Sequence, residues 1–183
     1  MSVAKEQIEH LRYPVGRFYY EPGYSPEKRA ELLSHIRKLP AQLKERLQDV
    51  DESLLDIPYR PEGWTIRQVV HHVVDSHMNA YIRFKLGLTE DTPTIKPYKE
   101  GAWANLADTQ HTPLTVSLAL LEALHTRWLV LLESLEEADW QRAVFHPEHQ
   151  KNLKLEMFLA LYSWHSRHHL AHVDLVLDKE GRG

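Results

Sequence analysis

Four long segments of this chain repeat their apolar residues every three or four positions, which is the spacing of one face of an α-helix. The first segment begins at Ser25 and Pro26, an N-cap residue followed by proline, and extends to about residue 48. Pro40 lies inside it, where we expect a kink or an interruption. The second begins at Thr65 and Gln68, which form a capping-box pattern, and reaches about residue 86.

The third segment follows Thr112 and Pro113, which we expect to cap it, and the fourth follows a polar loop around His146 and Pro147. No stretch alternates apolar and polar residues for long enough to predict a strand. Four helices with apolar faces must bury those faces on each other, so the sequence predicts an all-α, antiparallel four-helix bundle. Residues 11–24 are aromatic and interrupted by proline and glycine, which predicts an ordered, extended arm on the surface.

Composition excludes several classes of protein. The length of 183 residues without internal repeats predicts a single domain over residues 1–183. A net charge of −4, with basic residues scattered among acidic ones, argues against a nucleic-acid partner. There is no cysteine, so any metal must be held by nitrogen and oxygen. The N-terminus lacks the apolar stretch of a signal peptide and no apolar run approaches a membrane span, so we expect a soluble, cytoplasmic protein.

The predicted fourth helix carries four histidines within residues 164–172, arranged as two pairs spaced four residues apart. One helical turn brings such side chains together on one face, which is a common arrangement for divalent-metal ligands. With His165 placed at zero, at roughly 100° per residue, the apolar stripe covers about 20° to 80° and His169 lies at about 40°. His168 and His172 fall on the flank of the stripe, at about −60° and −20°. We therefore favour His165 and His169 as the inward-pointing ligands.

A zinc-type catalytic site needs three protein ligands and a vacant position, and the predicted second helix offers His71, His72 and His77. Geometry alone does not choose among them. Periodicity ranks His77 first because it lies near the centre of the apolar arc. A single histidine at such a position is, however, more often a hydrogen-bonded core residue than a ligand.

The second and fourth helices resemble a known family. The segment from Gly63 to Asn79, GWTIRQVVHHVVDSHMN, together with WHSRHH from Trp164 to His169, is similar to the DinB superfamily and, within it, to the YfiT branch. Members of this branch are regarded as metal-dependent hydrolases and are related to bacillithiol transferases. The resemblance extends over nearly the whole chain and implies a four-helix bundle with an N-terminal arm.

The resemblance also implies the ligand set. In the family a tryptophan opens the second helix and a ligand histidine follows eight residues later, which corresponds here to Trp64 and His72. The paired histidines of the fourth helix correspond to His165 and His169, in agreement with the face argument. By the same resemblance, His71 and His168, each next to a predicted ligand, are expected to support a ligand from outside the metal site or to lie at the surface. His77 is expected to be a core or pocket-lining residue.

Three neutral imidazoles leave the metal ion its full charge and at least one open position, which allows a bound water to become a nucleophile for hydrolysis. The same centre could lower the pKa of a bound thiol, which is the chemistry of a bacillithiol-type S-transferase. Zinc and nickel both suit imidazole nitrogen. Asp75 is a candidate for proton transfer, and Glu156 and Tyr162 are available for that role.

The sequence therefore predicts a metal-dependent hydrolase acting on a small molecule. Two alternatives remain open: a thiol transferase, and a metal-binding stress protein without turnover. Exposed aromatic residues in the arm and Trp103 offer apolar surface for a second subunit. We expect a homodimer, mainly because members of the family that the chain resembles are commonly dimeric.

Overall fold

The computed structural model describes residues 2–180. In chain order its elements are α1 (Ser2–Arg12), α2 (Pro26–Leu47), α3 (Glu52–Leu55), α4 (Ile66–Thr89), α5 (Glu100–Trp103), α6 (Ala107–His111), α7 (Leu114–Glu133), α8 (Glu137–Trp140), β1 (Ala143–His146), β2 (Lys151–Lys154) and α9 (Leu155–Glu180). The long helices α2, α4, α7 and α9 are the four that the sequence predicts, and together they form the predicted four-helix bundle.

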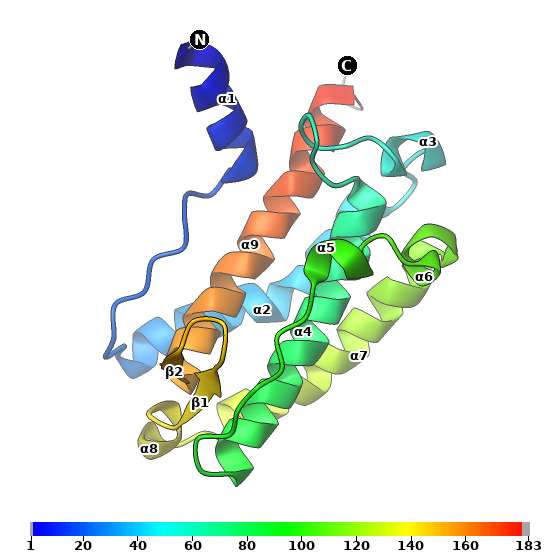
Figure 1. Cartoon of the computed structure of the whole chain (residues 1–183). Helices are drawn as coiled ribbons and strands as arrows, with labels where there is room; N and C mark the ends of the chain where they lie inside the picture. Colours follow the sequence, from blue (N-terminus) through cyan, green and yellow to red (C-terminus); the bar gives the residue numbers. More distant parts are fainter. Residues whose placement is uncertain (1, 181–183) are drawn as a thin grey trace.

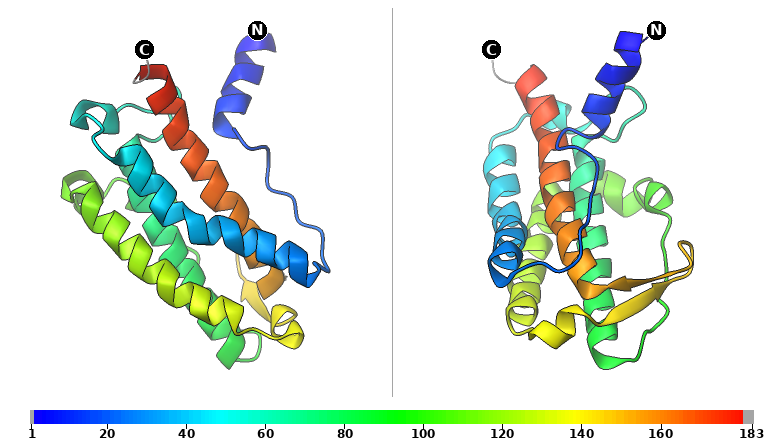
Figure 2. Two further views of the ribbon diagram at one scale, coloured as in Figure 1. Left: turned by 180° about the vertical axis from the view of Figure 1, so that it is seen from behind. Right: turned by 90° about the vertical axis from the view of Figure 1, so that its left-hand side faces the viewer.

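The four long helices form a closed ring in which α2 and α4 each pack against both α7 and α9. Their directions differ from the simple antiparallel bundle that we expected. Helices α2 and α9 run one way, whereas α4 and α7 run the other way, side by side (Figures 1 and 2). The reason is the connection between α4 and α7, which returns along the length of the bundle through α5 and α6 before α7 begins.

The N-terminal ends of the long helices agree in part with the caps that the sequence predicts. The Ser25 side chain accepts a hydrogen bond from the backbone N–H of Lys28, and Thr65 and Gln68 form the expected capping box at α4. Thr112, however, does not cap α7. Pro113 occupies the N-cap position there, and Thr112 instead ends α6. Helix α2 continues through Pro40 without a break.

A short antiparallel hairpin of β1 and β2 leads into α9, and the sequence argument missed it. Each strand has only four residues, which is too short for an alternating pattern to stand out. The hairpin is held to the start of the α4–α7 connection, because the backbone N–H of Ile95 donates to the carbonyl of Phe145 at 3.0 Å. It therefore brings His146 and its neighbours towards the bundle.

The N-terminal arm is ordered and extended, as predicted, and it follows helix α1, which was not predicted (Figure 2). The arm runs alongside α9. The indole Nε1–H of Trp164 donates to the carbonyl of Gly16 at 2.9 Å, and the hydroxyl of Tyr20 donates to Glu156 at 3.0 Å. These contacts place the arm over one side of α9.

Two groups of buried apolar side chains form the core. One surrounds Phe84, Trp128 and Phe158 near the end of the bundle that carries the hairpin, and the other surrounds Val70 and Leu121 near the opposite end. A layer of buried polar side chains separates the two groups: Ser76, His77, His125, Ser163, Ser166, His168 and His169. Burying so many polar groups is unfavourable unless they are hydrogen-bonded, so this layer is where a functional site is expected.

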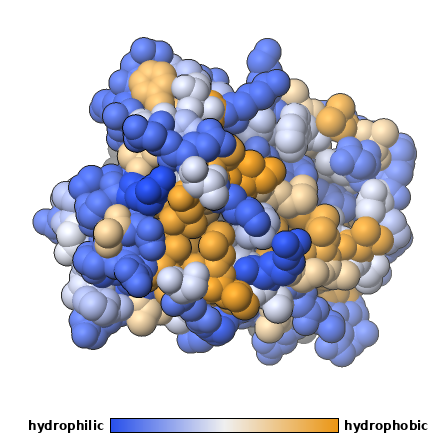
Figure 3. Space-filling view, turned by 90° about the horizontal axis from the view of Figure 1, so that it is seen from below, coloured by the Kyte–Doolittle hydropathy of each residue, from blue (hydrophilic) through white to orange (hydrophobic). Residues whose placement is uncertain are grey.

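Within the described residues, only α7 is long and apolar enough to qualify as a membrane span by length and hydropathy. Its buried side packs against α2 and α4, as a bundle helix does. Apolar side chains also gather in a patch, surrounded by hydrophilic ones, at the end of the bundle that carries α8 and the hairpin (Figure 3).

Candidate metal centre

Three histidines from two helices converge beside the polar layer. His72 comes from α4, and His165 and His169 come from successive turns of α9. Each offers one ring nitrogen, and these atoms lie within 4.8 Å of one another. The structure therefore brings together the set that the sequence and the family resemblance predicted. Trp64 packs against His72, with ring centroids 4.6 Å apart, and helps to hold that ring in place.

The spacing of the nitrogens suits a single ion. His72 Nε2 and His165 Nε2 lie 3.2 Å apart. Two nitrogens that bind one tetrahedral zinc at 2.0–2.1 Å are separated by about 3.3 Å. Because this separation matches the observed one, the two imidazoles need little movement to share a metal ion.

The environment keeps these rings neutral, which is the form that binds metal. Burial lowers the pKa of His72 to about 4, with a smaller contribution from His168. Burial, followed by the neighbouring imidazoles, holds the pKa values of His165 and His169 well below the ordinary value. A neutral imidazole carries a lone pair on one nitrogen, so the donors are already in the protonation state that a metal requires.

The three histidines line a pocket of about 460 Å³. Other residues of its wall come from α4, from α9, from the connection after α4 and from the hairpin, and they include Ser76, Arg83, Tyr98, Glu100, His146, Glu148, His149 and Tyr162. The pocket gives a small molecule access to the open side of the histidine group.

Sequence reasoning missed most of this wall. The connection and the hairpin contribute Tyr98, His146 and His149, and neither segment carries a local pattern that predicts its place in the fold. Arg83 was predicted neither as a ligand nor as a catalytic residue. Its Nη1 lies 3.4 Å from the Tyr162 hydroxyl, and among the described residues no carboxylate forms an ion pair with it.

His168 and His172, which the sequence placed on the flank of the apolar stripe, are both buried. They are 7% and 1% exposed, because the N-terminal arm and the segment before α4 cover that side of α9. The ring of Tyr59 stacks on His172 at 3.8 Å, and His172 Nε2 lies 3.3 Å from the carbonyl of Arg12. His168, His169 and His172 form a second histidine group, and their ring nitrogens also lie within 4.8 Å of one another.

The remaining histidines of α4 have distinct surroundings. His71 is buried, and its Nδ1 forms a 2.7 Å hydrogen bond with the Ser117 hydroxyl, away from the other rings. It is therefore not a surface residue. His77 is completely buried, as expected for a core residue, but its Nε2 contacts His165 Nδ1 at 3.1 Å. His77 thus supports a predicted ligand directly.

The three proposed acid or base residues also differ in position. Asp75 is half-buried and is not part of the pocket wall; burial and then the nearby charge of Asp108 raise its pKa to about 6. Glu156 is fully buried and forms an ion pair with Arg29, so its role is structural. Tyr162 does line the pocket.

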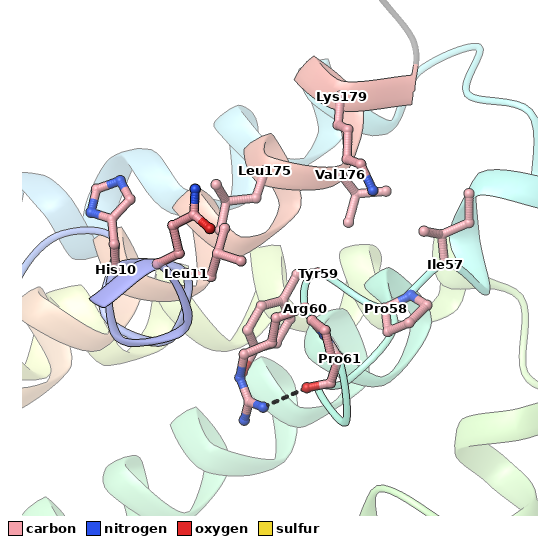
Figure 4. Close-up of a pocket in the computed structure, with 11 residues that line it drawn as sticks. His10, Leu11, Ile57, Pro58, Tyr59, Arg60, Pro61, Leu175, Val176 and Lys179 are labelled. Carbon is pink, nitrogen blue, oxygen red and sulfur yellow. Dashed lines mark hydrogen bonds between the residues drawn. The ribbon is translucent and has the colours of Figure 1, made fainter. Parts of the chain in front are cut away.

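A larger pocket, of about 720 Å³, lies elsewhere, between α1, the segment around Tyr59 and the C-terminal end of α9 (Figure 4). It is largely apolar, with His10 and Arg60 on its wall. Neither histidine group lines it. Pocket volume alone therefore does not identify the pocket that contains the candidate metal ligands.

Comparison with known proteins agrees with this geometry. Residues 35–173 match the DinB superfamily. A protein of Bacillus cereus named "putative metal-dependent hydrolase" is 53% identical over 166 residues, which is 91% of this chain and 95% of the relative. A Bacillus mycoides protein of the same description is 51% identical over 94% of this chain and 98% of its own length.

Two solved structures share the fold. YfiT from Bacillus subtilis, described as a probable metal-dependent hydrolase with an unusual four-helix bundle topology, has a TM-score of 0.91 and 44% identity. That match covers 95% of this chain and 99% of YfiT. A mycothiol-dependent maleylpyruvate isomerase shares the fold at a TM-score of 0.62 and 18% identity, over 82% of this chain and 66% of the isomerase. This chain, with its family match over most of its length and a close relative across nearly all of it, belongs to the DinB superfamily.

Proposed function

We propose that this protein is a metal-dependent hydrolase in which His72, His165 and His169 hold a divalent ion, zinc or nickel, next to a small-molecule pocket. The observation that carries the proposal is the convergence of three neutral imidazoles on the wall of one pocket. The names of the relatives support metal dependence and hydrolysis as the reaction class. An ion in such a site supplies Lewis acidity, which makes water or a thiol nucleophilic near neutral pH.

Arg83 and Tyr162 are suited to hold the substrate. The Arg83 guanidinium lines the pocket, and among the described residues it is not neutralised by a carboxylate. We assign Arg83 and the neighbouring Tyr162 hydroxyl to the carbonyl or carboxylate oxygen of the substrate, because charge-assisted hydrogen bonds orient such groups strongly.

His146 is suited to accept a proton. It is 8% exposed and lines the pocket, and its Nδ1 has no hydrogen-bond partner in the described part of the chain. Burial and the adjacent His149 lower its pKa, so the ring is neutral at pH 7 and has a lone pair that can accept a proton. We assign it the role of general base in place of Asp75.

Thiol transfer is the second candidate because an ion held by three imidazoles activates a bound thiol as well as a bound water. The chain contains no cysteine, so such a thiol would come from solution. Both reactions would use the same three histidines.

The experiment that tests the proposal compares four mixtures. Protein loaded with zinc or nickel is incubated with a carboxylic ester or an alkylating electrophile, each with and without glutathione, and the products are identified by mass spectrometry. Ester cleavage without thiol supports hydrolysis, and a thioether formed only with thiol supports transfer. A fully metal-loaded protein that is inactive across a panel of such compounds would support the non-catalytic alternative.

A further inference from the structure

Pro40 lies in the middle of α2, yet the helix continues from Pro26 to Leu47. Proline has no N–H, so the carbonyl of Ile36, four residues earlier, loses its usual helical partner. Ile36 and Pro40 are both buried, and a buried carbonyl without a partner is unfavourable. The partner that replaces Pro40 is His125 of α7, whose Nδ1 lies 2.8 Å from the Ile36 carbonyl oxygen.

A chain of hydrogen bonds continues from this carbonyl across the polar layer. His125 Nε2 lies 2.8 Å from His77 Nδ1, and His77 Nε2 lies 3.1 Å from His165 Nδ1. His125 and His77 are 1% and 0% exposed, so no water competes for these contacts. Three histidines from three helices thus connect the carbonyl of α2 to the polar layer of α9.

The direction of every hydrogen bond in this chain follows from its first member. A carbonyl can only accept, so His125 must donate from Nδ1, and a neutral ring then has only a lone pair on Nε2. His77 must therefore donate from Nδ1 and accept at Nε2. His165 must in turn donate from Nδ1, which leaves the lone pair on its Nε2, the atom that faces His72 Nε2 at 3.2 Å.

We propose that His125 and His77 form a relay, anchored on the carbonyl that Pro40 frees, which fixes the tautomer and orientation of His165 as a metal ligand. His77, His125 and Pro40 are then positioning residues rather than ligands. The inference deepens the proposed function, because it rests on the same three-histidine centre. Ligand histidines in metal sites commonly donate their second N–H to a carboxylate, a backbone carbonyl or a water, and here the lone pair of His77 takes that place.

His169, the second proposed ligand on α9, has its tautomer set in the same way, by a histidine that is hydrogen-bonded to a backbone carbonyl. His172 Nε2 lies 3.3 Å from the carbonyl of Arg12 and therefore donates to it, which leaves a lone pair on His172 Nδ1. His169 Nδ1 lies 3.3 Å from that atom, so it donates and keeps the lone pair on Nε2. The second histidine group is thus better explained as a support for His169 than as a separate metal site.

The tautomers can be measured without any metal. We would record ¹⁵N spectra of histidine side chains in the metal-free protein at pH 8, where even an unshifted imidazole is neutral. The expected result is Nδ1–H in His125, His77 and His165, the opposite of the tautomer that neutral imidazole favours in water. A proton on Nε2 of His165 in the wild-type protein would overturn the proposal.

Two variants of His125 separate a relay from simple packing. His125→Phe keeps a ring but removes both hydrogen bonds, so His77 and His165 should become mixtures of tautomers. His125→Gln retains a donor for Ile36 and an acceptor for His77, so it should restore the wild-type pattern. If both variants fold and give the same spectrum as the wild type, the relay does not control His165.

Affinity for Zn²⁺ alone, measured by competition with a coloured chelator, gives the second readout. His125→Phe should lower it, by at most the about 10- to 100-fold that follows removal of a direct partner of a metal-ligating histidine, because His125 acts on His165 through His77. His125→Gln should stay within about threefold of wild type. Equal losses in both variants would indicate a packing role and contradict the proposal. The tautomers are measured without metal, so the two proposals can fail separately. If the wild-type protein shows the expected Nδ1–H tautomers but binds no Zn²⁺, only the proposed function is rejected.

Pro40→Ala covers the case in which the His125 variants fail to fold. Alanine restores an N–H that competes for the Ile36 carbonyl, while removing proline favours the helix. The expected signature is a raised melting temperature together with mixed tautomers at His77 and His165. A raised melting temperature with unchanged tautomers would remove Pro40 from the relay.

Discussion

Arg29 of α2 and Glu156 of α9 form an ion pair, with Nη1 and Oε1 3.1 Å apart and side chains only 7% and 1% exposed. The Glu156 carboxylate also accepts hydrogen bonds from the Tyr20 hydroxyl and from the backbone N–H groups of Gly23 and Tyr24. One buried carboxylate therefore joins the bundle to the end of the N-terminal arm.

Glu156→Ala should lower the free energy of unfolding by about 3 kcal/mol, because it leaves the buried Arg29 guanidinium with only the exposed Glu137 as its partner and three donors without their acceptor. Glu156→Gln keeps an acceptor oxygen and should cost less. Urea unfolding at pH 7 measures both. A fully stable Glu156→Ala variant would show that the arm does not depend on this contact.

Replacing His72, His165 or His169 by Ala should remove most of the bound metal, because each supplies one of three protein nitrogens. His168→Ala is the matched control on α9 and should retain the metal. Elemental analysis of the purified proteins gives the metal content. If His168→Ala loses the metal while His72→Ala keeps it, the ion is held by the second histidine group instead.

Arg83→Leu should raise KM about tenfold for any substrate with a carbonyl or carboxylate group, since a charge-assisted hydrogen bond contributes about 1.5 to 3 kcal/mol. Metal content should not change, because Arg83 is not a ligand. Arg127→Leu, an exposed arginine of α7 outside the pocket wall, is the control. Steady-state kinetics with unchanged KM in Arg83→Leu would contradict the assignment.

Asp75→Asn should stabilise the protein near neutral pH. The pKa of Asp75 is raised from 3.8 to about 6, so the folded state binds its proton more tightly than the unfolded chain does. As pH rises through this interval the unfolded chain ionises first, and wild-type stability falls. Above pH 6 the variant should be more stable by about 1 kcal/mol, allowing for partial solvent screening.

The advantage of Asp75→Asn should disappear below pH 4, where the wild-type carboxyl is protonated in both states. Thermal unfolding across this pH range tests the prediction. Asp108→Asn should give a smaller gain, since burial is the larger cause of the shift. Because Asp75 is not part of the pocket wall, activity should survive its replacement.

We also predict a homodimer. The outer side of α7 exposes Val116, Leu120 and Val130, which are 53%, 44% and 68% accessible in a single chain. A second copy would cover this apolar face. Light scattering should give twice the 21.5 kDa chain mass, and Val130→Lys should shift the protein towards monomer. A wild-type mass of 21.5 kDa at micromolar concentration would exclude the dimer.

The four long helices, and the starts of α2 and α4, were predictable because their causes are local. The hydroxyl of Ser25 reaches the N–H of Lys28, and Thr65 and Gln68 cap each other, whatever the rest of the chain does. The hairpin was missed because four residues per strand carry too weak a pattern, and its position depends on the contact between Ile95 and Phe145.

The pairing of His165 with His169 follows from the sequence alone, because four residues make about one helical turn and place both rings on the same face. The choice of His72 over His71 and His77 came from family resemblance, since periodicity favoured His77. The packing of α4 against α9 supports His72: its Nε2 lies beside His165 Nε2, whereas His77 meets the opposite ring nitrogen, Nδ1.

The sequence by itself thus determined the helices, the apolar faces and one pair of rings on a shared face, all of which depend on neighbours within one or two turns. Tertiary structure decided what those rings contact. The Pro40 position predicted a disturbance in α2, but only the approach of His125 from α7 shows that the freed Ile36 carbonyl has a partner. Such contacts join residues far apart in the chain, here 89 positions, and no local pattern encodes them.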